Sequence, residues 1–129
     1  MNIGRFSIVL ADRLSAIVPA GIHVTADNGI LRYSEDNKSG RAGTYISANF
    51  GVYGESDEED LVGVAVQALD ELQDYVSEAT CTPWPGVHSQ PSPNGQIRGV
   101  QLELWYVENG KVVLACSPIP LADLDEGHS

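Results

Sequence analysis

Two Asn-Gly pairs, each set between runs of strand-forming residues, constrain the fold of this chain more than any other feature. An Asn-Gly pair supplies the two positive-φ residues that a type I′ turn needs to join neighbouring antiparallel strands. Around Asn28-Gly29, a two-residue loop gathers most apolar side chains of the flanking segments on one side, and a one-residue slip would separate them. The sequence therefore predicts a hairpin with strands at 22–27 and 30–34.

The second pair, Asn109-Gly110, predicts another hairpin, with strands at about 97–107 and 112–117. Near this turn apolar side chains fall on both faces of the hairpin. One face collects Val100, Leu102, Leu104, Tyr106, Val113 and Ala115. The other face collects Trp105, Val107, Val112, Leu114 and Cys116. A strand that is apolar on both faces needs a cover on each side.

Apolar residues at three- and four-residue steps predict two helices. The first covers residues 3–18. The second begins at Ser56, which has the spacing of a capping box with Glu59, and continues along a wide apolar stripe to about Glu78. Between them, alternating apolar and polar residues predict a third strand at 44–50, after the first hairpin.

The resulting order is helix, three strands, helix, two strands, and we expect one domain over residues 1–129. Strands joined by tight hairpins favour the α+β class, with two helices and a five-stranded, mainly antiparallel sheet. The proline-rich segment 80–96 is expected to be a loop, in which Trp84 either anchors the loop to the core or contacts a partner. The acidic tail 118–129 is expected to be frayed.

The charge of the chain is strongly acidic and unevenly distributed. Its 129 residues have a net charge of −11, and residues 51–129 hold two basic side chains against fourteen acidic ones. Such a surface repels phosphate and anionic lipid, so nucleic acids and membranes are disfavoured as partners. Asp70, Asp74 and Glu78 recur at four-residue steps, which predicts an acidic strip along the second helix.

The second apolar face of the closing hairpin can be covered in more than one way. The two helices can pack on opposite sides of the sheet, or the 80–96 loop can fold Trp84 over this face. Alternatively, the face stays exposed and serves self-association or capture of a partner. The residues of that exposed patch would be Trp105, Val107, Val112 and Leu114.

No residue pattern in the sequence indicates catalysis. The three histidines do not lie at metal-ligand spacing, no GxSxG or phosphate-loop motif occurs, and we expect neither a metal nor another cofactor. If a catalytic pair existed, His23 with Arg32 or Ser34 would be the best candidate. Two cysteines without a CxxC pair, and no apolar run near the roughly 20 residues of a membrane span, indicate a cytoplasmic protein.

Three segments carry a resemblance to other proteins. They are Leu-Ala-Asp-Arg-Leu (10–14), Val-Ala-Val-Gln-Ala-Leu-Asp-Glu-Leu-Gln-Asp-Tyr-Val (64–76) and Pro-Trp-Pro-Gly (83–86), and together they resemble a group of small acidic proteins from high-GC actinobacteria. That resemblance implies no particular activity. Separately, the order of elements and the acidity are similar to those of type III secretion chaperones, although the third helix of those chaperones is missing. This similarity implies a cytosolic, dimeric α+β protein that binds an unfolded segment of its partner.

These features predict a non-enzymatic protein-binding, adaptor or chaperone-like protein that forms a homodimer. Its apolar sheet face would contact a partner or a second copy, and the acidic helix would favour a basic protein partner. The contacting residues would be Trp84, Trp105, Val107, Val112, Leu114, Asp70, Asp74 and Glu78. Two alternatives stay open: a small-molecule-binding protein or minor enzyme with a pocket between the sheet and the 80–96 loop, and an inhibitor of the immunity or antitoxin type.

Overall fold

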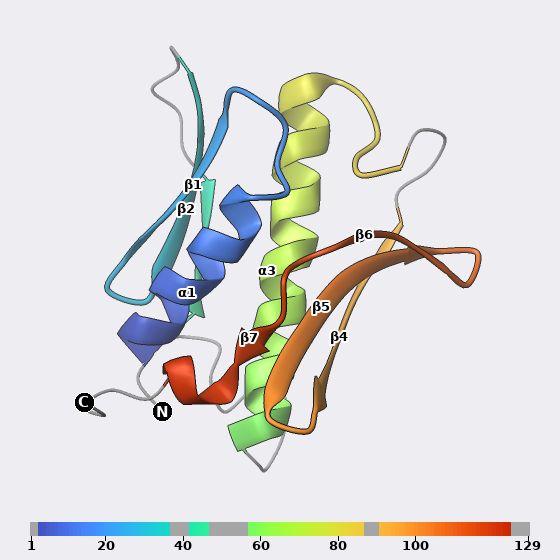
Figure 1. The fold of residues 1–129 in the computed structure, drawn as a ribbon. Coiled ribbons are helices and arrows are strands. Elements are labelled where there is room, and N and C mark those ends of the chain that lie inside the picture. The colour runs from blue at the N-terminus through green and yellow to red at the C-terminus, as the bar shows by residue number, and fades with distance from the viewer. Residues whose placement is uncertain (1–2, 37–41, 47–56, 87–90, 125–129) are drawn as a thin grey trace.

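The computed structural model describes residues 3–36, 42–46, 57–86 and 91–124, and its class is α+β (Figure 1). Two α-helices, seven strands and one short 3₁₀ helix occur among these residues. In chain order they are α1 (Ile3–Ser15), β1 (Ile22–Asp27), β2 (Ile30–Glu35), β3 (Ala42–Tyr45), α3 (Asp57–Thr80), β4 (Ser92–Arg98), β5 (Gln101–Glu108), β6 (Lys111–Ala115), β7 (Ile119–Pro120) and the 3₁₀ helix η1 (Leu121–Leu124).

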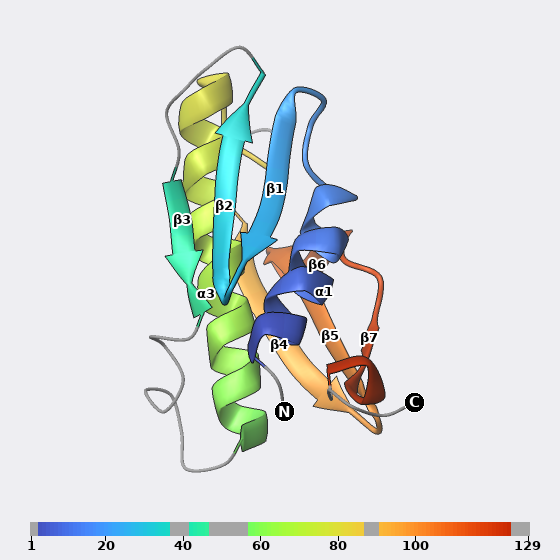
Figure 2. The same cartoon turned by 90° about the vertical axis from the view of Figure 1, so that its left-hand side faces the viewer.

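The strands form two sheets, so the prediction of one five-stranded sheet is wrong. Sheet A has the order β1-β2-β3, and sheet B has the order β4-β5-β6, with β7 also pairing with β5. Figure 1 shows α3 upright between the two sheets, and Figure 2 shows α1 alongside β1. All of the strand pairings are antiparallel.

The difference from the predicted sheet begins with β4, which occupies the second half of the expected 80–96 loop. β4 pairs with β5 through a two-residue turn at Gly99 and Val100, so the expected strand at 97–107 is in fact two strands. Gly99 has a φ of +64°, as the first central position of a type II′ turn requires. β4 could not be recognised from the sequence because Pro93 and Gly95 are poor strand formers, although an edge strand such as β4 tolerates proline.

The first hairpin has the predicted register, with Asp27 opposite Ile30 and Val24 opposite Tyr33. The first helix is shorter than predicted and ends at Ser15. Beyond it, the amides of Ala16 and Ile17 each donate one 3₁₀-type hydrogen bond to the carbonyl three residues earlier. Of the predicted strand at 44–50, Thr44 and Tyr45 belong to β3, Ile46 is buried just beyond the end of that strand, and residues 47–50 lie outside the described residues. The capping residue Ser56 also lies outside them.

The C-terminal segment is ordered through Leu124, which corrects the expectation of a frayed tail over 118–129. β7 pairs with the start of β5, and Ile119 and Leu124 are buried. Two arginines of α1 also hold this segment: Arg5 donates to the carbonyl of Asp123 at 2.9 Å, and Arg13 donates to the carbonyl of Pro118 at 3.3 Å. Residues 125–129 lie outside the described residues.

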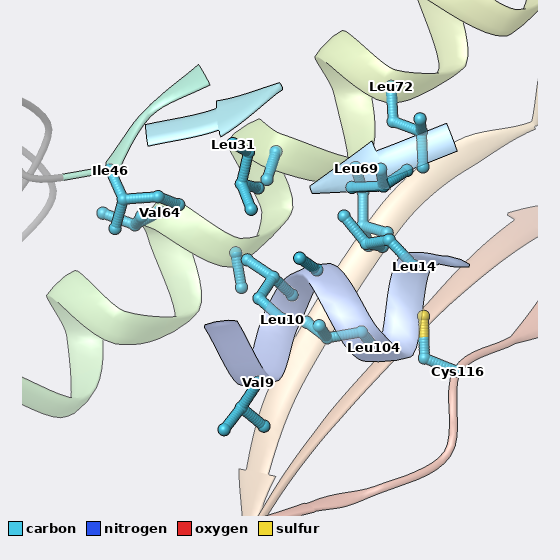
Figure 3. Close-up of a cluster of buried hydrophobic side chains, with 14 of the residues drawn as sticks. Val9, Leu10, Leu14, Leu31, Ile46, Val64, Leu69, Leu72, Leu104 and Cys116 are labelled. Carbon is cyan, nitrogen blue, oxygen red and sulfur yellow. The ribbon is translucent and has the colours of Figure 1, made fainter. Parts of the chain in front are cut away.

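The core lies where both helices face the two sheets. Figure 3 shows side chains of α1, α3, β2 and β5 pointing into one shared space. The fully buried residues of this cluster include Phe6, Leu10, Leu14, Leu31, Tyr33, Leu69, Leu72, Leu102 and Tyr106. A shared core of this kind makes α3 the link between sheet A and sheet B.

Replacing Gly95 by alanine should destabilise the chain, because a side chain at this position of β4 would press against α3 and β5. A Cβ at Gly95 would lie 2.9 Å from Cδ2 of Leu104 and 3.1 Å from Cγ2 of Val66. We expect the free energy of unfolding, measured with urea, to fall by about 1–3 kcal/mol, as overpacking does elsewhere. Gly110→Ala is not a suitable control because Gly110 has a positive φ, whereas Asn94→Ala, at an exposed position of the same strand, should change stability much less. Equal losses in the two variants would contradict this account of the helix–strand contact.

Candidate functional site

A groove runs between the C-terminal half of α3 and sheet A. Its first part is a hollow of about 250 Å³ lined by Tyr33, Gly43, Glu71, Asp74, Tyr75 and Glu78. Its second part is a hollow of about 240 Å³ lined by Glu35, Tyr75, Glu78, Ala79 and Cys81. The two hollows share Tyr75 and Glu78, and we call them together the α3 groove.

A chain of hydrogen bonds fixes one wall of the α3 groove. The Thr44 hydroxyl on β3 donates to the Oε2 atom of Glu71, so the Tyr33 hydroxyl donates to Oγ1 of Thr44, at 2.6 Å. Gln67, one helical turn before Glu71, donates to its Oε1 atom at 3.2 Å. Burial raises the pKa of Tyr33 far above its ordinary value, so its hydroxyl stays protonated and available as the donor. Glu71 is therefore held in place, whereas Asp74 and Glu78 of the same groove are exposed.

The α3 groove combines an aromatic surface with negative charge. The rings of Tyr33 and Tyr75 have centroids 5.9 Å apart, and Tyr75 is only partly buried. Among the described residues, no lysine, arginine or histidine forms an ion pair with Glu71, Asp74 or Glu78. A carboxylate cluster beside a partly open aromatic ring favours a cation, because both the charges and the ring face attract one.

The predicted acidic strip only partly coincides with the α3 groove. Asp74 and Glu78 line it, whereas Asp70 is exposed on α3 and is not among the lining residues. Desolvation raises the pKa of Asp70 above its ordinary value, and the nearby carboxylates of Asp74 and Glu71 raise it further. The strip is thus a region of mutual repulsion, as the four-residue spacing indicates.

Sequence reasoning missed most of the groove's other residues. The sequence pattern places Tyr33 on the apolar face of the first hairpin and Glu71 on the polar face of α3, but nothing local links them. The link is Thr44, which lies 27 residues before Glu71 in the chain. The one available signal is that Tyr75 follows Glu71 by four residues, which places both on one side of α3.

The second candidate surface lies on the side of sheet B that faces away from α3. Next to the turn the structure follows the prediction: Asn109 and Gly110 have φ values of +52° and +78°, and Glu108 pairs with Lys111. The adjacent pair, Val107 with Val112, also has the predicted register. Up to this point the apolar face is arranged as the sequence indicates.

A β-bulge then shifts the register by one residue. Tyr106 pairs with Leu114 and Trp105 with Ala115, and Val113 is left as the extra residue. Because paired residues share a face, Leu114 lies on the core side with Tyr106, where it packs against the core. The assignment of Leu114 to the exposed patch is therefore corrected, and Ala115 takes its place.

The remaining apolar surface is smaller than predicted but present. Val112 is 58% exposed and Val113 is 42% exposed, while Trp105 and Val107 are half-buried. We call this surface the outer patch, and its members are Trp105, Val107, Val112, Val113 and Ala115. Figures 1 and 2 show the described helices α1 and α3 on the other side of sheet B.

A hollow of about 330 Å³ opens beside the outer patch. It is lined by Glu103, Leu104, Trp105, Val112, Ala115, Cys116 and Pro118. Cys116, assigned by the sequence pattern to the outer face, is buried. Burial raises the pKa of Cys116 to about 11, against the opposing effect of Arg13, so its thiol stays protonated at neutral pH. The hollow is thus uncharged except for Glu103 at its rim.

Of the two predicted roles of Trp84, anchor of its loop or contact with a partner, the structure shows the first. Its ring packs edge-on against Tyr106, with centroids 5.4 Å apart and an interplanar angle of 70°. Tyr106 belongs to the core side of β5 and donates a hydrogen bond to the carbonyl of Leu69 at 2.7 Å. Trp84 therefore contacts the core side of sheet B and does not cover the outer patch.

The candidate catalytic pair, His23 with Arg32 or Ser34, lies on the outer face of sheet A. His23 pairs across the strands with Ser34, and its Nε2 atom forms a hydrogen bond with Oδ1 of Asp36. Arg32 pairs with Thr25 on the same face. The side chains of His23 and Asp36 are 52% and 62% exposed, so this row is the polar, solvent-facing side of the hairpin.

The substitution Asp70→Asn should stabilise the chain at neutral pH. Because the pKa of Asp70 is raised on folding, its ionisation lowers stability as pH rises above the ordinary value of 3.8. Removing one repulsive four-residue pair should increase the free energy of unfolding at pH 7 by about 0.2–0.5 kcal/mol, and the gain should vanish near pH 3. Asp12→Asn, which removes a partner of Arg13, is the control and should give no gain. Urea unfolding at the two pH values measures both, and a gain that persists at the lower pH would contradict this origin.

Within the described residues, no group of three or more histidine, cysteine, aspartate or glutamate side chains is placed to hold a metal ion. None of the described helices is both long enough and apolar enough to cross a membrane. The chain matches no protein-family model, no curated protein and no solved structure.

Proposed function

We propose that this chain is a non-enzymatic protein-binding protein, of the adaptor or chaperone-like kind, that holds a basic segment of a protein partner in the α3 groove. The observation that carries the proposal is a hollow in which three carboxylates, Glu71, Asp74 and Glu78, surround an accessible tyrosine ring. The negative charges of the groove favour a basic partner. The elongated shape of the groove favours a segment of protein chain.

The lining of the α3 groove fits the side chain of lysine or arginine. Such a side chain has an apolar stem and a cationic head, so the stem can lie along Tyr75 while the head reaches the carboxylates. Glu71 is already oriented by Thr44 and Gln67, so little conformational entropy is lost when it accepts a hydrogen bond from the guest. A charge-assisted hydrogen bond of this kind is about twice as strong as a neutral one.

The length of the α3 groove favours an extended chain over a single small cation. Its two hollows adjoin at Tyr75 and Glu78, and the second hollow adds Glu35. Two basic side chains of one segment can therefore occupy the two hollows at once. The net charge of −11 also raises the rate at which a basic partner arrives, because its field extends beyond the groove.

Binding of a short lysine-rich peptide tests this proposal directly. Titration calorimetry should detect binding at about 0.01 M salt, and affinity should fall steeply by about 0.15 M, as the Debye length shrinks from about 30 Å to about 8 Å. A matched peptide with glutamate in place of lysine should not bind. Affinity that is insensitive to salt would contradict an electrostatic groove.

A double variant locates the binding on the chain. Asp74→Asn with Glu78→Gln keeps the shape of the groove but removes two of its charges, and we expect peptide affinity to fall about tenfold, roughly 1.4 kcal/mol. The control is Asp12→Asn with Asp27→Asn, which also removes two charges, from exposed carboxylates outside the groove. If the control loses as much affinity as the double variant, peptide binding reports net charge alone and the groove is not the site.

A further inference from the structure

The outer patch has an unusual composition for a surface on this chain. Two of its valines rank among the most exposed large apolar side chains of the described residues, Val112 at 58% and Val113 at 42%. The half-buried Trp105 lies behind them, opposite Ala115. Exposed apolar side chains gathered on two adjacent strands mark a contact surface more often than scattered ones do.

Within the outer patch, an exposed valine and a hollow lie next to each other. The β-bulge leaves Val113 as an extra residue on β6, next to Val112. The hollow of about 330 Å³ opens next to Val113, and Val112 lines it together with Trp105, Ala115 and Pro118. A patch that carries both a projecting group and a receiving hollow can complement itself around a two-fold axis, because each copy then supplies what the other needs.

The charge of sheet B permits a second copy to approach there. The chain as a whole has a net charge of −11, so two copies repel each other over most of their surfaces. Sheet B carries Arg98 and Lys111, the only basic residues after residue 50, and they balance Glu103 and Glu108. This sheet is therefore locally neutral, and it is the part of the chain on which a like-charged copy meets least repulsion.

Contact through the face of sheet B is favoured over pairing of the two β6 edges. β6 pairs with β5 alone among the described strands, so its outer edge is open to another strand. However, a bulge and a lysine on an edge strand are features that oppose edge-to-edge pairing. The side chains of the outer patch, rather than the backbone of β6, are then the contacting groups.

We propose that two copies of this chain associate around a two-fold axis through their outer patches. Val113 of each copy enters the hollow that Trp105 and Val112 of the other copy line. This association is independent of the α3 groove, which is formed by sheet A and α3.

Sedimentation velocity over a range of concentrations, at low and at high salt, tests the association. The chain should sediment as a dimer, and added salt should leave the dimer unchanged or strengthen it by screening the repulsion between two acidic copies. Peptide binding in the α3 groove should respond to salt in the opposite direction, so the two proposals can fail separately. A chain that stays monomeric at all concentrations and salt levels would overturn the association.

Matched variants place the interface. Val112→Arg should shift the dimer dissociation constant upward by at least about a hundredfold, because it puts a charge into the apolar contact. Ile8→Arg on α1 changes an equally exposed apolar residue (55% against 58%) and should leave the dimer intact. Equal dissociation by both variants, with circular dichroism showing that both are folded, would place the interface elsewhere.

Discussion

The burial of one apolar face of α3 between two sheets is the constraint on which the rest of the structure depends. Leu69 and Leu72 are fully buried there, and β4 comes close to the same helix at Gly95. Burying a side chain of this size contributes about 1.5–3 kcal/mol. Each repulsive carboxylate pair on the exposed face costs only about 0.2–0.5 kcal/mol. The helix therefore tolerates a charge pattern that an isolated peptide would resist, and that pattern gives the exposed face its preference for cations.

The parts of the fold that could be predicted from sequence are those fixed by local chemistry. The register of the first hairpin follows from Asn28-Gly29 and strict alternation, and the structure has that register. β4 could not be predicted, because its strand character comes from pairing with β5 rather than from its own residues. The bulge that leaves Val113 unpaired is also a tertiary feature: nothing between Lys111 and Ala115 marks where the register shifts. For the α3 groove, only the acidic side chains of the helix could be predicted. The rest could not, because the hydrogen bond from Thr44 to Glu71 joins segments far apart in sequence.

The two candidate surfaces differ in charge. The acidic groove is formed by α3 and sheet A, and the neutral outer patch belongs to sheet B (Figures 1 and 2). An association through sheet B leaves the groove of each copy open. Two grooves carried by one assembly can engage two basic segments of the same partner, and the second contact then benefits from the high effective concentration that the first one creates. Moderate affinity at each groove is sufficient in that arrangement.

The two arginine contacts of α1 also have a consequence for how the chain acquires its structure during synthesis. Arg5 and Arg13 contact carbonyls that lie 118 and 105 residues further along the chain. A ribosome producing about 5–20 residues per second therefore releases α1 several seconds before its final neighbours emerge. Until then the nascent helix lacks the C-terminal segment, including η1, that packs against it in the complete structure. Contacts between such distant segments slow folding, so α1 reaches its final packing only after residues 118–124 have emerged.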